Sequence, residues 1–310
     1  MILVTGGTGF VGRVLIRHLI ASGKQVRTLL RPSKKSPQLP KGIPVEAAVC
    51  SLLDERGLRA ALKDVDYIFH LAGTERHSSR ADLQNVDVNG SEVLAAVAAQ
   101  SGVKNIITLS HLGADRSSAY PVLKAKAMTE NAIIQSGIPY TILRSAVVYG
   151  PGDQFTTSLA RLLRMSPGFF MIPGNGNTLL QPIWIEDLVN CLTMCLDNPD
   201  LNNRVISIGG LEALSFQQIL QVITQQMGIK RMTWKVSPPL MRGLALFMDQ
   251  FTRFPVSIFW LDYLSADRTT QLDTVPRVFG IIPARFHNQL GYLNSRNKNL
   301  SVEVSWDHVE

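Results

Sequence analysis

Three glycines near the start of the chain have the spacing of a phosphate-binding turn. Gly6, Gly9 and Gly12 follow an apolar run, and a helical pattern from Arg13 to Ala21 comes after them. The first glycine allows a tight turn, the second lets the backbone approach a pyrophosphate, and the third permits close helix–strand packing. Strand, turn and helix occur in the required order, which disfavours a purely structural turn. The sequence therefore predicts a dinucleotide site, with Thr8, Phe10 and Val11 between the glycines.

The next predicted strand, Gln25 to Leu30, ends at Arg31. Sites that prefer NAD usually carry an acid about 20 residues past the glycines, whereas an arginine accommodates the 2′-phosphate of NADP. Arg31 is followed by Lys34 and Lys35. A solvated basic loop would also explain these charges. The pattern favours NADP as cofactor and leaves NAD open.

Basic residues are concentrated in the first part of the chain. The formal net charge is +7, yet residues 1–45 hold eight Lys or Arg and no Asp or Glu, so the remainder carries −1. A local excess beside a predicted phosphate site is unlike the broad basic stripe of a nucleic-acid binder. We therefore expect a small-molecule substrate and no nucleic-acid partner.

The composition is that of an ordinary globular protein. At 310 residues with 45% apolar content, the chain can form one large domain or a domain with a lobe. Its cysteines, Cys50, Cys191 and Cys195, fit neither a disulfide framework nor a zinc site, and we expect no metal. No signal peptide precedes the first strand and no apolar run approaches the roughly 18 residues of a membrane span, so we expect a cytoplasmic protein.

Strands and helices alternate through the first half. After the first two strands, the pattern predicts strands at 45–49, 67–71 and 106–110, and helices at 55–62 and 86–100. Such alternation implies an α/β fold with a doubly wound parallel sheet and helices on both faces. Ligands bind outside the carboxyl ends of such strands, here Thr5, Leu30, Cys50, Leu71, Ser110 and Arg144.

The second half is predicted to contain helices at 155–164 and 185–196 and a strand at 204–208. Ser215 and Gln218 form a capping box before a helix at 216–227. Residues 240–264 are unusually apolar and aromatic. They could form a helical lobe that closes over a pocket, or a docking face for a membrane or protein partner.

Four motifs together resemble the short-chain dehydrogenase/reductase superfamily. They are Thr5–Gly12, His70-Leu71-Ala72-Gly73, Leu143-Arg144 with Val148–Asp153, and Pro182–Leu188. The chain looks like the extended or atypical branch, which includes sugar-nucleotide epimerases, NmrA-like proteins and the NAD(P)H-binding accessory subunit of respiratory complex I.

The resemblance implies a Rossmann fold and a set of cofactor contacts. It places Leu71, Ala72 and Gly73 beside the nicotinamide ribose, Ser51 and Leu52 beside the adenine, and Tyr149 over the nicotinamide. The chain departs from the family pattern twice, with Ser51 for the usual acid and Asp87 for the usual asparagine.

Active members of the superfamily use a tyrosine, a lysine one helical turn later, and a serine at the end of the fifth strand. Hydride transfer at a carbonyl needs a matched proton transfer, and a phenol of pKa about 10 needs a nearby ammonium to act near pH 7. Tyr120, Lys124 and Ser110 have this local arrangement, and they are the candidate catalytic residues.

The register of the following helix offers a second interpretation. Counting back from Glu130 places the family lysine on Lys126 and the family tyrosine on Val122. Pro121 suits the first turn of a helix, which would put Tyr120 before it. Either Tyr120 and Lys124 form a working pair, or the catalytic site is degenerate and Lys126 holds the cofactor ribose.

We therefore expect an NAD(P)-binding Rossmann domain over 1–150, a smaller substrate lobe over 151–293, and a polar tail over 294–310. The leading hypothesis is an NADP-preferring oxidoreductase or epimerase acting on a small carbonyl or sugar-type substrate. The alternative is a non-catalytic scaffold, assembly or redox-sensing protein that binds the nucleotide without turnover.

Overall fold

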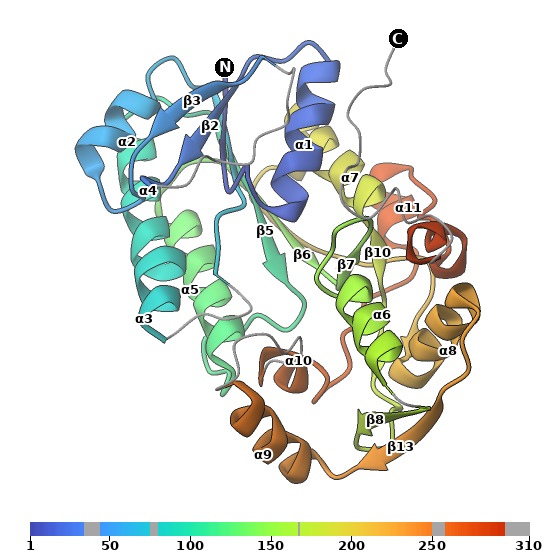
Figure 1. Cartoon of the computed structure of the whole chain (residues 1–310). Coiled ribbons are helices and arrows are strands. Elements are labelled where there is room, and N and C mark those ends of the chain that lie inside the picture. Colours follow the sequence, from blue (N-terminus) through green and yellow to red (C-terminus); the bar gives the residue numbers. More distant parts are fainter. Residues whose placement is uncertain (34–43, 75–79, 167, 250–257, 295–310) are drawn as a thin grey trace. The chain divides into compact units, whose positions relative to one another are not determined.

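A computed structural model describes residues 1–33, 44–74, 80–166, 168–249 and 258–294. The chain forms two compact units (Figure 1). Unit 1 comprises Met1–Ser145 and Leu188–Ser207, and unit 2 comprises Ala146–Asp187 and the chain from Ile208 onward. The chain thus leaves unit 1 after Ser145 and returns to it for 20 residues, so unit 1 is made of two separate segments.

Unit 1 is built on a seven-stranded parallel sheet in the order β3-β2-β1-β4-β5-β6-β11. The strands are β1 Ile2–Thr5, β2 Val26–Leu30, β3 Glu46–Val49, β4 Tyr67–His70, β5 Asn105–His111, β6 Tyr140–Ser145 and β11 Arg204–Ile208. β1 pairs with β2 on one side and β4 on the other, so the strand order reverses there. This confirms the predicted doubly wound α/β fold.

The central strands are buried because helices cover both faces of a parallel sheet. Every residue of β1 and β2 is buried, whereas edge strand β3 is largely exposed. The helices of unit 1 are α1 Phe10–Ala21, α2 Glu55–Ala61, α3 Arg80–Asp82, α4 Gly90–Ala99, α5 Pro121–Gln135 and α7 Ile185–Asp197, with a 3₁₀ turn η2 at Pro199–Leu201; α7 begins in unit 2.

The predicted single helix over 86–100 is wrong in its first turn. A π-helix, η1 Leu83–Asn89, precedes α4. The Asp87 carbonyl oxygen accepts hydrogen bonds from the Ser91 and Thr129 hydroxyls. Side chains that bond a helical carbonyl in this way favour a local departure from the α ladder, which the hydrophobic pattern does not reveal.

Unit 2 combines short strand pairs with helices around one apolar core. The pairs are β7 Val148–Tyr149 with β10 Ile183–Trp184, β9 Leu179–Leu180 with β12 Leu214–Ser215, and β8 Phe169–Pro173 with β13 Met232–Val236. The helices are α6 Thr156–Met165, α8 Phe216–Met227, α9 Pro238–Asp249, α10 Ile258–Tyr263 and α11 Thr274–Phe279, with 3₁₀ turns η3 Phe286–Gln289 and η4 Gly291–Leu293.

Two features of unit 2 bear on the sequence predictions. The capping box is confirmed, because Ser215 Oγ accepts from Gln218 N while Gln218 Oε1 accepts from Ser215 N. Part of the apolar segment 240–264, residues 250–257, lies outside the described residues, as does the polar tail from 295 on.

Candidate functional site

The glycine turn after β1 leaves no room for side chains. Gly6 has φ +73°, and a Cβ there would lie 2.6 Å from the Leu71 backbone. A Cβ on Gly12 would lie directly against the Gly6 carbonyl oxygen. The turn therefore packs between the end of β4 and the start of α1, which only glycine permits.

The amino terminus of α1 is open toward an anion. Gly9 is the N-cap residue, with an extended backbone (φ −74°, ψ 173°), and no side chain caps the helix within the described chain. The first turn holds no acidic residue. The N–H groups of Phe10, Val11 and Gly12 precede the intrahelical ladder, and the helix dipole favours negative charge beside them. This cradle fits a dinucleotide pyrophosphate.

A buried hydrogen-bonded chain fixes the end of β4. Thr5 Oγ1 lies 2.8 Å from His70 Nδ1 and accepts from Ala72 N, and His70 Nε2 lies 2.9 Å from Ser91 Oγ. Burial, with a smaller contribution from the Lys126 charge, lowers the pKa of His70 to about 3. His70 is therefore a neutral structural residue that orients the backbone of Leu71, Ala72 and Gly73. The sequence motif contained His70, but only the three residues after it were expected to have a role.

An ammonium group lies beside that backbone. Lys126 Nζ is 3.6 Å from Asp87 Oδ1, and both side chains are almost fully buried. A Cβ on Gly73 would lie 2.8 Å from Lys126 Nζ and 3.0 Å from Asp87 Oδ1. Asp87 Oδ2 also accepts from Thr74 N and Oγ1. The structure thus brings Gly73, Asp87 and Lys126 together, and Thr74 joins them without any hint in the sequence.

The candidate pair Tyr120 and Lys124 has a different placement. α5 begins at Pro121, and Tyr120 is its N-cap residue with an extended backbone (φ −90°, ψ 117°). Tyr120 therefore does not lie on the helix, and its carbonyl oxygen accepts from Lys124 N. Lys124 is exposed and lines a surface hollow beside η1. The start of α5 at Pro121 agrees with the interpretation that places Tyr120 before the helix, and a working Tyr120–Lys124 pair stays a prediction.

Val122 occupies the helical position four residues before Lys126. It packs on a small apolar cluster that includes Leu83, Val88 and Ala125. Ser110, the third candidate, is buried near the carboxyl end of β5, and its Oγ has no hydrogen-bond partner among the described residues. A buried hydroxyl without a partner is a ready contact for a ligand oxygen.

The residues expected around the adenine and its ribose lie at the ends of β2 and β3. Arg31 is exposed, and Lys34 and Lys35 fall outside the described residues. Ser51 Oγ accepts from Leu53 N at 3.2 Å. Leu52 packs closely on Gly90, where a Cβ would approach Leu52 Cβ to 2.9 Å. Ser51 and Leu52 are thus held by a turn and by α4.

Tyr149 lies in the core of unit 2. Its ring centroid is 4.8 Å from that of Phe286 and 5.4 Å from that of Trp184. Burial raises the pKa of its hydroxyl, and the nearby Asp187 and Glu212 charges add to the effect. The packing holds the ring, whereas the Tyr149 hydroxyl is buried and has no hydrogen-bond partner among the described residues.

Asp153 of the same motif also has a structural role. Its carboxylate accepts from Gly150 N, Thr156 Oγ1 and Thr157 N, which fixes the loop before α6. Burial raises the pKa of the Asp153 carboxyl, although the three hydrogen bonds act to lower it.

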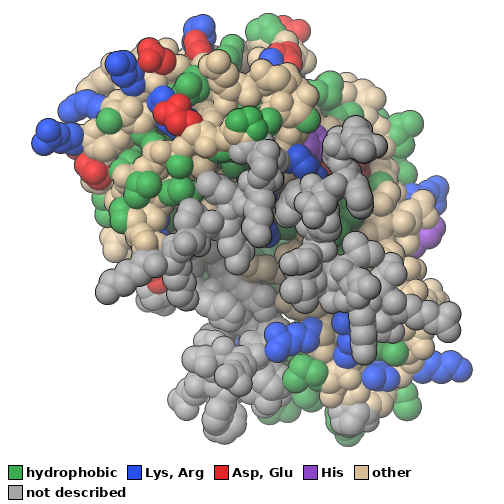
Figure 2. Space-filling view, turned by 45° about the horizontal axis from the view of Figure 1, so that its top comes forward, with side chains coloured by type: hydrophobic (Ala, Val, Ile, Leu, Met, Phe, Trp, Pro, Cys, Tyr) green, Lys and Arg blue, Asp and Glu red, His purple; other side chains and the backbone are tan. Residues whose placement is uncertain are grey.

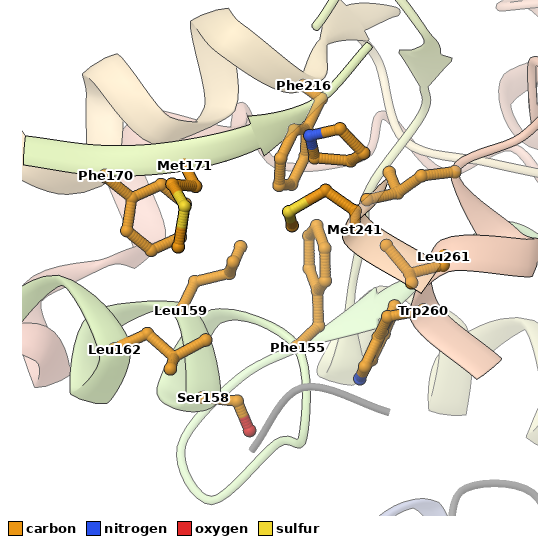
Figure 3. A pocket seen from close by; sticks show the side chains of 12 residues that line it. Phe155, Ser158, Leu159, Leu162, Phe170, Met171, Phe216, Met241, Trp260 and Leu261 are labelled. Carbon is orange, nitrogen blue, oxygen red and sulfur yellow. The ribbon is translucent and has the colours of Figure 1, made fainter. Parts of the chain in front are cut away.

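Unit 2 contains an apolar groove (Figure 3). Its free volume is about 60 Å³. Eleven apolar residues and Ser158 line it, among them Phe155, Leu159, Phe170, Met241 and Trp260. The Trp260 Nε1 atom is buried and lacks a hydrogen-bond partner among the described residues. Trp260 and Met241 come from the apolar segment that the sequence singled out.

None of the described helices has the length and apolar character required to cross a membrane. Within the same residues, no three His, Cys, Asp or Glu side chains are grouped so that they could hold a metal ion.

Comparisons with known proteins place this geometry in a family. Residues 2–209 match the NAD dependent epimerase/dehydratase family. The chain is 27% identical over 281 residues to "NADH dehydrogenase [ubiquinone] 1 alpha subcomplex subunit 9, mitochondrial" of Arabidopsis thaliana, covering 87% of this chain and 70% of that protein. It is 29% identical over 285 residues to "Sterol demethylase protein B" of Methylococcus capsulatus, covering 81% and 82%.

A solved structure supports the same fold. The structure of MoeE5 in complex with UDP-glucose and NAD aligns with a TM-score of 0.72 at 21% identity, over 93% of this chain and 95% of that one. The glycine turn, the β4 end and the parallel sheet belong to the matched region. The chain is therefore a member of the NAD dependent epimerase/dehydratase family.

Proposed function

We propose that this protein is an NAD(P)H-dependent oxidoreductase whose cofactor is held by the glycine turn, the 71–73 backbone and Lys126. The observation that carries the proposal is the buried Lys126 ammonium beside Gly73. When bound, the dinucleotide supplies the hydride at its nicotinamide ring.

The ammonium of Lys126 suits the ribose of such a cofactor. It has three donors, and the Asp87 carboxylate 3.6 Å away offsets its charge in the buried site. Asp87 in turn bonds Thr74, so the ammonium, the carboxylate and the backbone after β4 form one unit. Ser110 adds a buried hydroxyl that could bond a substrate oxygen.

Cofactor titrations on two lysine variants test this assignment. Lys126→Ala removes donors from the proposed ribose contact, so NADPH affinity measured by calorimetry should fall at least tenfold. Lys124→Ala, two residues away on the exposed side of α5, is the matched control and should change the affinity less than twofold. Lys126→Arg keeps the charge and should recover part of the loss.

The reverse pattern would reject the proposal. A large loss of NADPH affinity in Lys124→Ala and none in Lys126→Ala would indicate that Tyr120 and Lys124, and not Lys126, belong to the cofactor site. Circular dichroism on each variant separates lost binding from lost folding.

The groove of unit 2 bears on the substrate. It is apolar apart from Ser158, and its free volume of about 60 Å³ fits only a short apolar group, so it suits a hydrocarbon substituent better than a sugar. The names of two relatives, sterol demethylase protein B and a ceramide reductase of Caulobacter vibrioides (26% identical), mention a sterol and a ceramide, which are both rich in hydrocarbon. Leu159→Trp, which fills the groove, should weaken binding of a short-chain alkyl ketone while leaving NADPH affinity unchanged.

A second candidate is a nucleotide-binding scaffold without turnover. The specific observation is Val122, an apolar side chain four residues before Lys126, together with Tyr120 outside the helix. The relatedness to a complex I subunit supports this candidate. Under it, Tyr120→Phe is silent, and no carbonyl substrate accelerates NADPH oxidation by the parent protein.

A further inference from the structure

The strand pair β8–β13 exposes an apolar face. Its register sets Met232 opposite Phe169 and Trp234 opposite Met171, and strand alternation puts these four side chains on one side. Their exposed fractions are 79% for Met232, 65% for Trp234, 42% for Phe169 and 38% for Met171. Ile172, on the other side, is fully buried. One side of this ribbon therefore packs on unit 2 and the other presents large apolar groups to solvent.

Two further apolar residues extend the face along the chain. Met165 at the end of α6 is 58% exposed, and Leu240 near the start of α9 is 67% exposed. The rings of Phe169 and Trp234 meet edge to face with their centroids 5.7 Å apart, and both side chains stay exposed to solvent. The four ribbon residues are neighbours in the strand pair, and neighbouring exposed apolar residues of this size mark a surface that binds a partner.

The two chain segments that contain the ribbon strands carry cations and no acids, although Asp262, outside them, pairs with Arg242. Residues 154–185 and 213–248 contain six Lys or Arg and no Asp or Glu. Of these cations, Arg161, Lys230 and Lys235 are exposed and form no ion pair within the described chain. Figure 2 shows Lys and Arg side chains close to apolar side chains on the lower part of the visible face.

We infer that this face, defined by Met165, Phe169, Met171, Met232, Trp234 and Leu240 with the cations Arg161 and Lys230, docks on an anionic lipid bilayer. Trp and Phe are favoured at the membrane–water interface, where an apolar ring meets a polar boundary. Lys and Arg beside them are attracted to anionic headgroups. The exposed aromatic rings and the excess of cations in the two segments complement such a surface in both polarity and charge.

Vesicle co-sedimentation of the full chain tests the inference without any cofactor. Vesicles of phosphatidylcholine with 30% phosphatidylglycerol should retain the protein in low salt, and pure phosphatidylcholine should not. Raising the salt to 0.5 M should release most of it, because the charge attraction is screened. Trp fluorescence should shift to shorter wavelength on binding, and this shift should be lost in Trp234→Phe.

Charge-reversed pairs inside and outside this face test its role. Arg161→Glu with Lys230→Glu should weaken vesicle binding at least tenfold. Trp234→Ala should weaken vesicle binding severalfold in both high and low salt, because salt does not screen an apolar contact. Arg56→Glu with Lys63→Glu makes the same charge change on exposed residues of unit 1 and should have little effect.

Three results would overturn the inference. They are no retention by anionic vesicles, equal losses in the two charge-reversed pairs, and retention that is unaffected by Arg161→Glu with Lys230→Glu. Binding to poly-glutamate without binding to vesicles would instead assign the face to an acidic protein. The proposed oxidoreductase function stands or falls separately, because NADPH titration does not involve this surface.

Discussion

Lys124 and Lys126 are two positions apart on α5, and their surroundings differ completely. Neighbours at this spacing point about 200° apart around a helix. Lys124 is exposed, whereas the Lys126 side chain is 7% exposed and faces Asp87. At the residue scale, helix register therefore decides which lysine lies in the buried site that we propose for the cofactor.

Gly9 offers a test that separates folding from binding. Its backbone conformation is open to any residue and Asp is a better N-cap than Gly, but a Cβ there would lie 3.1 Å from the Gly6 carbonyl oxygen, so the turn must shift slightly. Gly9→Asp should therefore leave the fold largely intact, while its carboxylate repels the cofactor phosphates and abolishes NADPH binding in calorimetry. Gly9→Ala is the uncharged control and should bind measurably. An unchanged NADPH affinity in Gly9→Asp would show that the cofactor phosphates do not bind at this turn.

His70 predicts a specific pH dependence of stability. Its folded-state pKa is about 3 and its unfolded value is 6.5, so the unfolded state binds the extra proton between these values. This contribution is complete above pH 6.5 and decreases as pH falls, by roughly 2 kcal/mol between pH 6.5 and 5. Urea unfolding at pH 7 and 5 should show this loss in the parent protein and a smaller one in His70→Gln. The exposed-residue control His287→Gln should retain the parent slope; an unchanged slope in His70→Gln would contradict the assignment.

At the element scale, the π-helix η1 and α5 meet through a buried ion pair. η1 carries Asp87, whose carbonyl oxygen bonds Ser91 and Thr129 and whose carboxylate faces Lys126. The irregular turn thus holds both the backbone and the side chain of Asp87 against α5. This is the contact on which the proposed ribose site depends.

A double-mutant cycle measures that contact. Removing one partner leaves a buried charge unpaired, so Asp87→Asn or Lys126→Met alone should lower the free energy of unfolding by about 3 kcal/mol. Asn retains an acceptor for Thr74 N, which limits the change to the charge. The double variant should lose much less than the sum, as measured by urea denaturation. Additive losses, within about 0.5 kcal/mol, would show that the two groups do not interact.

At the scale of the whole molecule, positive charge is concentrated in two regions. Residues 1–45 carry eight cations without an acid, and residues 154–185 and 213–248 carry six. The first region belongs to unit 1 and contains the predicted phosphate contacts, whereas the second belongs to unit 2 and surrounds the exposed ribbon. The net charge of +7 is therefore the sum of two basic regions and an acidic remainder; we assign the first region to the proposed nucleotide site and the second to the inferred membrane docking.

Arg31 links the first region to cofactor choice. Each charge-assisted contact to a 2′-phosphate is worth roughly 1.5–3 kcal/mol, so Arg31→Asp should weaken NADPH at least tenfold and leave NADH affinity nearly unchanged. Arg56→Asp makes the same charge change at an exposed residue of α2 and is the control. Titrating both cofactors into the parent and the two variants gives the comparison. Equal affinities of the parent for NADPH and NADH would eliminate the NADP preference.

The local elements could be predicted from the sequence because their signals are local. The β1–α1 glycine turn, strand β11 and the Ser215 capping box depend on residues within a few positions of one another. Apolar strands alternating with amphipathic helices then determine a parallel, doubly wound sheet, since few other arrangements bury such strands on both faces.

Only the tertiary structure decided which side chains meet. The helix register left Lys124 and Lys126 as alternatives, and the choice depended on where Pro121 starts α5 and where η1 places Asp87. The pairing of β8 with β13 joins residues more than 60 positions apart and turns Met232 and Trp234 outward. Contacts between residues so far apart in the sequence depend on how all the helices and strands pack together. No local sequence pattern determines that packing.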